Sequence, residues 1–159
     1  MTDIVFENRR FDPDLTSFHD HAKAMAKAFG YTADLAFDQH LAQLVRLRVA
    51  QINNCSYCLI LHAETSRTVG IHPAKIDNLG SWWESELFDP AEQAALAYCD
   101  ALTAGNAPGF ADIHERAAAF FDATEIAELA AIIINMNVWT RLKLAQGATP
   151  VAASIDAAP

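Results

Sequence analysis

Apolar residues recur along this chain with the period of an α-helix, and that spacing limits the possible folds more than any other feature. Within residues 14–29, steps of four, three and four separate Phe18, Ala22, Met25 and Phe29, which places them on one helical face. No segment shows the sustained apolar and polar alternation of a β-strand. The sequence therefore predicts an all-α fold.

Capping signals mark the starts of two later helices. Asp89-Pro90-Ala91-Glu92 combines an N-cap acid, a proline at the first helical position and a glutamate three residues after the cap. Asp122-Ala123-Thr124-Glu125 repeats the acid pair before a long helix that reaches Gly147. Helices are also predicted over residues 41–52 and 55–69, after Pro73 and after Pro108-Gly109.

The length of 159 residues is typical of one domain. Residues 1–147 are predicted to form that single helical domain. The remaining residues, 148–159, are predicted to be a flexible C-terminal tail.

Charge and hydropathy exclude several classes of partner. The 20 Asp and Glu residues outnumber the 11 Lys and Arg residues, and the formal net charge of -9 repels nucleic acid and anionic membrane surfaces. The apolar runs are far shorter than the roughly 20 residues that a membrane-spanning helix needs. The N-terminal residues lack the pattern of a secretory signal, so we expect a cytoplasmic protein.

The most informative motif is Cys55-x-x-Cys58-x-x-x-His62, which follows a predicted turn at Asn53-Asn54. Residues three and four apart lie on the same side of a helix, so two thiols and an imidazole are expected to converge. A helix N-terminus favours thiolates, and an imidazole can accept a thiol proton. These properties suit a cysteine pair that cycles between dithiol and disulfide.

Three interpretations of the motif compete. In the first, the cysteines are small buried hydrophobic residues and His62 is a core histidine with its hydrogen bonds satisfied. In the second, the three side chains bind a metal. In the third, they perform redox chemistry. A tetrahedral zinc site would be one ligand short, and the sequence holds no second Cys-x-x-Cys pair. Redox chemistry is favoured because a cytosolic Cys-x-x-Cys pair with an adjacent base is more often redox-active than structural.

Several other conspicuous residues favour structural roles. Cys99 lies in the apolar stripe of its helix and is expected in the core. Trp82 and Trp83 suit a core or subunit contact better than the roof of a substrate pocket. Asn137 and Arg141, one helical turn apart, suit an interface or a hydrogen bond to the cysteine helix.

The segment Leu44-Val-Arg-Leu-Arg-Val-Ala-Gln-Ile-Asn-Asn-Cys55-Ser-Tyr-Cys58-Leu-Ile-Leu-His62, with Gly70 eight residues later, resembles the core of the AhpD-like alkylhydroperoxidases. These proteins belong to the carboxymuconolactone decarboxylase superfamily. The resemblance covers about residues 41–104 and is less specific in the flanking helices. It implies an AhpD-like helical bundle, homo-oligomers built as trimers or hexamers, and an antioxidant peroxidase that reduces alkyl hydroperoxides.

The resemblance also implies a role for each residue of the motif. Cys58 would be the peroxidatic sulfur, assisted by His62, and Cys55 the resolving sulfur that closes the redox-active disulfide. An external dithiol or a reductant protein would then restore the dithiol, and the cycle needs no metal or other cofactor. Helix-terminus electrostatics alone would instead favour activating Cys55, the more N-terminal sulfur.

The chain departs from the family at Gln43. The better-characterised peroxidases carry a glutamate at this position as part of a proton relay with the histidine. An amide takes up no proton, so Gln43 would only orient His62 or a water. Weak peroxidase activity, or a redox-sensing or binding role, therefore stays an alternative. The decarboxylase branch is disfavoured because it uses no Cys-x-x-Cys pair.

Overall fold

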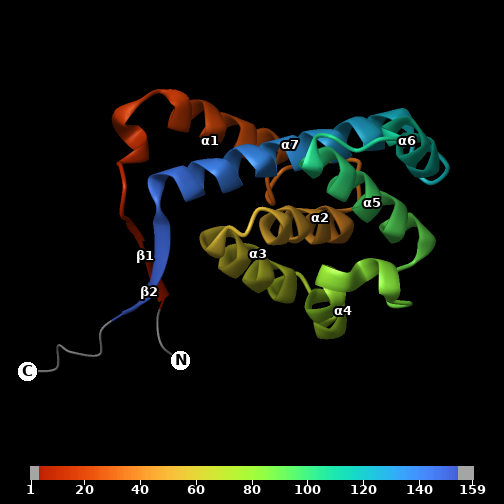
Figure 1. Ribbon diagram of the computed structural model, residues 1–159, viewed down its shortest axis with the longest axis horizontal. Helices are drawn as coiled ribbons and strands as arrows, with labels where there is room; N and C mark the ends of the chain where they lie inside the picture. The colour runs from red at the N-terminus through yellow and green to blue at the C-terminus, as the bar shows by residue number, and fades with distance from the viewer. Residues whose placement is uncertain (1–3, 154–159) are drawn as a thin grey trace, which may run out of the picture.

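The computed structural model describes residues 4–153 and is mainly helical (Figure 1). The described residues form β1 (Ile4–Asn8), α1 (Phe18–Phe29), α2 (Gln39–Ile52), α3 (Ser56–Thr68), α4 (Pro73–Asn78), α5 (Pro90–Ala104), α6 (Phe110–Ala118), α7 (Ala123–Gln146) and β2 (Ala148–Ala152). Two short 3-10 segments, Pro13–Leu15 and Leu79–Glu84, precede α1 and follow α4. The predicted helical class is confirmed for most of the chain, and the structure also contains a small two-stranded sheet that was not predicted.

Helix α2 lies at the centre of the fold. It is buried along most of its length because α3, α5 and α7 all pack against it. In Figure 1 it runs beneath the long α7, with α3 and α5 on either side. A helix that is enclosed on all sides needs no polar face, yet the buried residues of α2 include Gln43 and Arg46.

The apolar core has two parts that share α2. The larger part joins α2 to α5 and α7 and contains both cysteines of the motif. The smaller part packs Leu44 and Leu47 of α2 against α4 and Trp82. Cys99 lies fully buried in the larger part, where burial raises the pKa of its thiol, so its predicted core role is confirmed.

A polar contact ties α2 to α5. Arg48 donates two hydrogen bonds to the carboxylate of Asp100, at 2.7 and 2.9 Å, and Trp82 Nε1 donates to the same carboxylate at 3.1 Å. Trp83 is exposed, and the Arg48 guanidinium lies 5.7 Å from the centroid of its ring system. The predicted core role is therefore confirmed for Trp82.

The two ends of the chain pair with each other, which the sequence did not predict. Strands β1 and β2 are antiparallel, with Ile4 opposite Ala152 and Asn8 opposite Ala148. The prediction of a flexible tail is wrong for residues 148–152, and residues 154–159 lie outside the described residues. Each strand has only five residues and its partner lies at the other end of the chain, so no local pattern reveals the pairing.

Most helix boundaries follow the local signals. Capping boxes begin α5 at Asp89 and α7 at Asp122, as predicted, and Gly105 and Gly147 end these helices with positive φ. Helix α1 begins at Phe18, later than predicted, because Pro13–Leu15 forms a separate 3-10 turn. None of the helices in residues 4–153 is long and apolar enough to cross a membrane.

Substituting Asp122→Ala removes the carboxylate that accepts hydrogen bonds from the backbone N–H groups of Thr124 and Glu125. We expect a loss of about 1 kcal/mol in the free energy of unfolding. For a domain of this size, the melting temperature should fall by roughly 2–4 °C in a calorimetric scan. Glu115→Ala, at an exposed position on α6, is the matched control and should change little. Equal melting temperatures for the two variants would contradict the role of the cap.

Candidate active site

Cys55 and Cys58 lie where a turn becomes helix α3. Asn54, with a φ of 52°, reverses the chain after α2. Cys55 is the N-cap of α3, and its Sγ accepts a hydrogen bond from the backbone N–H of Cys58 at 3.3 Å. The two cysteines form a disulfide with Cα atoms 5.3 Å apart, so the structure is that of the oxidised protein.

The turn before the cysteines is anchored to α7. Asn53 Nδ2 donates to Asn137 Oδ1 at 3.0 Å and to Thr140 Oγ1 at 2.9 Å. Arg141 in turn donates to Asn137 one turn earlier on the same helix. Asn137 therefore accepts a hydrogen bond from the turn before α3, whereas the predicted contact was with the cysteine helix itself, and this bond fixes the start of α3 relative to α7.

The amide of Gln43 determines which nitrogen of His62 carries the hydrogen. Gln43 Nε2 lies 3.1 Å from His62 Nδ1 and 3.1 Å from the backbone oxygen of His62. A carbonyl oxygen only accepts hydrogen bonds, so the amide atom that faces it must be the NH₂ group. The same NH₂ group donates to Nδ1, and this hydrogen-bond network assigns the ring hydrogen to Nε2.

His62 is also uncharged at neutral pH. Burial, with a smaller contribution from the nearby charge of Arg46, lowers its pKa to about 4. Its backbone oxygen accepts a second hydrogen bond from Ser66 Oγ at 2.6 Å. The ring therefore offers an N–H donor at Nε2, and its other nitrogen is already occupied by Gln43.

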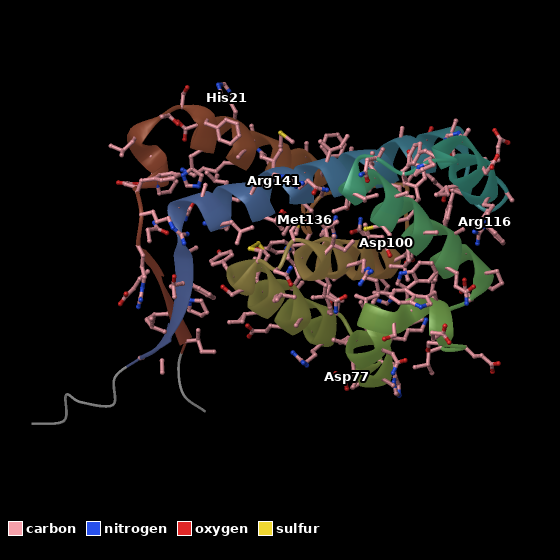
Figure 2. The ribbon with its side chains drawn as sticks, in the orientation of Figure 1. His21, Asp77, Asp100, Arg116, Met136 and Arg141 are labelled. Carbon is pink, nitrogen blue, oxygen red and sulfur yellow. A yellow bond between two sulfur atoms is a disulfide. The ribbon has the colours of Figure 1, made fainter. Side chains whose placement is uncertain are left out.

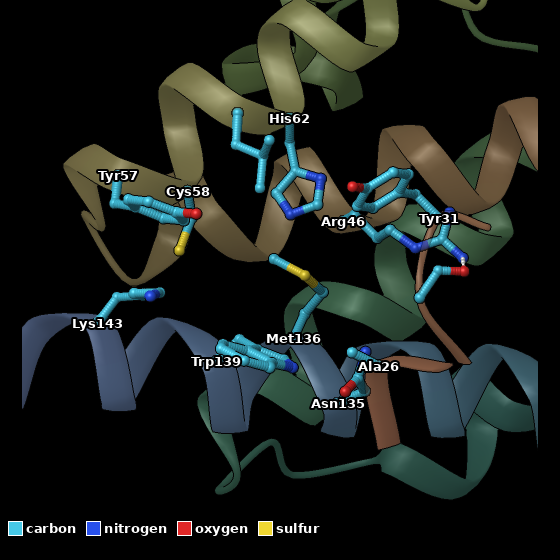
Figure 3. A pocket seen from close by; sticks show the side chains of 12 residues that line it. Ala26, Tyr31, Arg46, Tyr57, Cys58, His62, Asn135, Met136, Trp139 and Lys143 are labelled. Carbon is cyan, nitrogen blue, oxygen red and sulfur yellow. Dashed lines mark hydrogen bonds between the residues drawn. The ribbon is translucent and has the colours of Figure 1, made fainter. Parts of the chain in front are cut away.

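Cys58 and His62 line a partly open cavity of about 200 Å³ between α1, α2, α3 and α7. Figure 3 shows the His62 ring pointing from α3 toward Met136 of α7. Tyr57, Cys58 and Lys143 lie at one end of the cavity, and Arg46 and Tyr31 lie at the other. Cys58 and Arg46 therefore lie toward opposite ends of the same cavity.

Lys143 is a functional candidate that the sequence did not reveal. Its ammonium lies 4.5 Å from the ring centroid of Tyr57 and 5.5 Å from that of Trp139, and burial lowers its pKa. In Figure 3 it extends from α7 toward Cys58. A cation in this place favours the thiolate form of a nearby cysteine.

A second hollow, of about 160 Å³, lies near the disulfide. It is lined by Cys55, Arg10 and Lys143, together with the start of β2. The two cysteines therefore line different spaces, Cys58 the larger cavity and Cys55 the smaller one, and Lys143 lines both.

A relay carboxylate is missing from the part of the chain that the structure describes. Neither hollow beside the disulfide is lined by an aspartate or a glutamate. Glu64, on the same helix as the cysteines, is exposed. Among residues 4–153 there is also no group of three or more His, Cys, Asp or Glu side chains that could hold a metal ion.

Two patterns in the sequence could have indicated the missed residues. Asn135, Trp139 and Lys143 follow one another at intervals of four, which places them on one face of α7, and all three line the cavity. Arg46 is a charged residue within the apolar stripe of α2, which is the usual sign of a buried functional or capping group. Neither pattern indicates by itself that these helices face the cysteines.

Comparison with known proteins shows which family this chain belongs to. Residues 20–101 match the family model described as the carboxymuconolactone decarboxylase family. The uncharacterized protein YdfG of Bacillus subtilis (strain 168) is 28% identical over 126 residues, which are 79% of this chain and 86% of that protein. The uncharacterized protein YnjA of Escherichia coli (strain K12) is 34% identical over 111 residues, 68% of this chain and 59% of its own length.

Solved structures share the fold. A protein of unknown function from Agrobacterium tumefaciens, provisionally named an antioxidant defence protein AhpD, has a TM-score of 0.77 and 25% identity, covering 87% of this chain and 94% of its own. An uncharacterized peroxidase-related protein from Silicibacter sp. TM1040 has a TM-score of 0.71 at 19% identity, covering 84% of this chain and 70% of its own. The debrominase Bmp8, in a complex with 2,3,4-tribromopyrrole, has a TM-score of 0.69 at 19% identity, covering 87% of this chain and 71% of its own.

The family model covers more than half of the chain, including all of α2 and α3, and the Cys55–Cys58 pair lies at their junction. This protein belongs to the carboxymuconolactone decarboxylase family and has an AhpD-like fold.

Proposed function

We propose that this protein is a thiol-dependent peroxidase that reduces small organic hydroperoxides through the Cys55–Cys58 pair. The observation that carries the proposal is the position of Cys58, which forms a disulfide with Cys55 and lines a cavity with His62 and Lys143. A concave, mainly apolar cavity suits a small-molecule oxidant, and a disulfide at a helix N-terminus suits reversible redox chemistry. An antioxidant role in the cytoplasm follows from this proposal.

The reaction begins with the reduced pair. The Cys58 thiolate attacks the terminal oxygen of the hydroperoxide, the O–O bond breaks, and the alkoxide leaves as an alcohol after it takes up a proton. The Cys55 thiolate then attacks the sulfur of the resulting sulfenic acid, and hydroxide leaves as water after protonation. This step closes the disulfide that the structure contains.

His62 and Lys143 stabilise negative charge on different atoms. Lys143 holds negative charge on Cys58, because its ammonium is partly removed from water beside that cysteine. His62, neutral and with its hydrogen on Nε2, donates a hydrogen bond to the oxygen that becomes negative as the O–O bond breaks. His62 is a donor in this mechanism, whereas the sequence assigned it the role of a base.

An external dithiol completes the cycle. Its thiolate approaches through the smaller hollow and attacks Cys55, so that Cys58 leaves as the thiolate that Lys143 stabilises. A second attack within the mixed disulfide releases the oxidised reductant.

A redox sensor is the second candidate function. It is favoured by the hydrogen bond from Gln43 to His62, which replaces a proton relay with a fixed donor. Without a base beside Cys58, thiolate formation depends on Lys143 and the helix terminus alone. A sensor would form the disulfide once and reversibly, whereas a peroxidase would turn over with a reductant.

We also propose that the protein assembles into trimers or hexamers. Several large apolar side chains are exposed on the single chain, including Ile134 at 51% and Trp83 at 56%. Ile134 lies beside a shallow hollow that is lined by Leu102 and Val138. Contiguous exposed apolar surface of this kind is typical of subunit contacts.

Cys58→Ser should abolish turnover of cumene hydroperoxide with dithiothreitol, because no thiolate remains in the larger cavity. Without dithiothreitol, Cys55→Ser should reduce one equivalent and then stop, with a sulfenic acid on Cys58 that dimedone traps for mass spectrometry. Cys99→Ser is the matched control and should retain turnover, since Cys99 is buried away from both hollows. Turnover by Cys58→Ser would exclude this mechanism, and disulfide formation without turnover would favour the sensor.

Gln43→Glu should raise kcat/KM for hydroperoxide by at least about tenfold, because a carboxylate accepts the hydrogen of Nδ1 and leaves Nε2 free to act as a base. The ¹⁵N chemical shifts of the His62 ring should show the hydrogen moving from Nε2 to Nδ1. Gln39→Glu adds the same charge at an exposed position of α2 and should change neither measurement. An unchanged ring tautomer in Gln43→Glu would refute the assignment of His62 as a donor set by Gln43.

Light scattering coupled to gel filtration should give three or six times the chain mass of 17.4 kDa. Ile134→Lys places a charge in the exposed apolar surface of α7 and should lower the assembled fraction. A monomeric mass for the wild-type protein at micromolar concentration would contradict the proposed assembly.

A further inference from the structure

Arg46 is a buried cation that lines the cavity and has no carboxylate partner in the described part of the chain. Its side chain is 1% exposed, and no aspartate or glutamate among residues 4–153 forms an ion pair with it. Its Nη2 donates to the backbone oxygens of Phe29 and Gly30, at 3.3 and 2.9 Å. Its Nε is buried and has no hydrogen-bond partner.

The two hydrogen bonds of Nη2 explain only part of this arrangement. They place Arg46 at the C-terminal end of α1, where a positive charge stabilises the helix dipole. This capping role leaves the Nε donor of the guanidinium unused. A charged group that is removed from water normally has all of its donors paired, so the unpaired donor requires a second explanation.

Other unpaired donors line the same cavity. Trp139 Nε1 is shielded from water and has no partner among the described residues. Lys143 lies at the Cys58 end, and no carboxylate in residues 4–153 pairs with it. The one buried acceptor without a partner in the lining is Asn135 Oδ1. Two cations and an indole N–H therefore face a space that no carboxylate lines.

This local charge is opposite to that of the whole chain, whose formal net charge is -9. A positive cavity in an acidic protein attracts an anion specifically to that cavity, because the surface elsewhere repels it. A carboxylate beside the buried guanidinium of Arg46 would gain charge-assisted hydrogen bonds that are stronger than those of a neutral group. The apolar lining, including Met136 and Leu61, suits a short hydrocarbon segment between the two ends.

We propose that the cavity binds hydroperoxides that carry a carboxylate, with the carboxylate at Arg46 and the hydroperoxide at Cys58. This inference rests on the proposed peroxidase function and names its substrate class. The cavity volume limits the size, since an engineered apolar cavity of about 150 Å³ holds benzene. A cavity of about 200 Å³ therefore holds a molecule somewhat larger than benzene.

The test compares two hydroperoxides that differ only in charge. One is a six-carbon tertiary alkyl hydroperoxide with a terminal carboxylate, and the other is its primary amide, which has the same size and shape. We expect kcat/KM of the wild-type protein to be at least about tenfold higher for the carboxylate, the ratio typical of one hydrogen bond to a charged group.

Variants assign this preference to the cavity. Arg46→Gln should bring the ratio close to one, and Arg46→Lys should restore part of it. Arg116→Gln, on α6 and away from the cavity in Figure 2, removes a charge elsewhere and should leave the ratio unchanged. If Arg46→Gln does not fold, as loss of the α1 cap allows, Arg46→Lys provides the test.

A binding measurement separates the failure of this inference from the failure of the peroxidase proposal. The oxidised protein is titrated calorimetrically with the corresponding hydroxy acid and hydroxy amide, which are the alcohol products. Preferential binding of the acid, lost in the Arg46 variants, supports the anion site even if neither hydroperoxide is turned over. Equal turnover of both hydroperoxides, or equal or absent binding of both alcohols, overturns it.

Discussion

The enclosure of most of α2 by its neighbours is the constraint on which the rest of the structure depends. Because α3, α5 and α7 exclude water from most of this helix, its two buried polar side chains must find partners inside the protein. Gln43 finds His62 on α3, and Arg46 finds the last carbonyls of α1. These two contacts set how α1 and α3 approach α2, and the cavity beside Cys58 lies between them.

The same enclosure sets the chemistry of the cavity. Burial keeps His62 neutral, and the amide of Gln43 leaves it a hydrogen-bond donor. Positive charge enters only from Arg46 and Lys143, at opposite ends of the space. In the proposed mechanism, fixed donors and cations take the place of a proton relay and stabilise negative charge on sulfur and oxygen.

The site was predictable where its residues are close in sequence. Cys55, Cys58 and His62 are separated by three and four residues, so the geometry of a single helix brings them together. The contact of Gln43 with His62 was expected from the family pattern, and the structure confirms it. Lys143 and Trp139 lie some 80 residues later, and only the packing of α7 against α3 brings them to Cys58. The pairing of β1 with β2 was missed for the same reason.

The sequence by itself determined the helices, their caps and the cysteine motif, because each depends on interactions between residues less than about two helical turns apart. Only the tertiary structure decided that the two cysteines line different hollows and that, within residues 4–153, the larger hollow is lined by cations and by no carboxylate. The physical reason is that the burial of a residue and the charges around it depend on every helix that packs nearby. Those helices come from all parts of the chain, so their convergence is a property of packing rather than of local sequence.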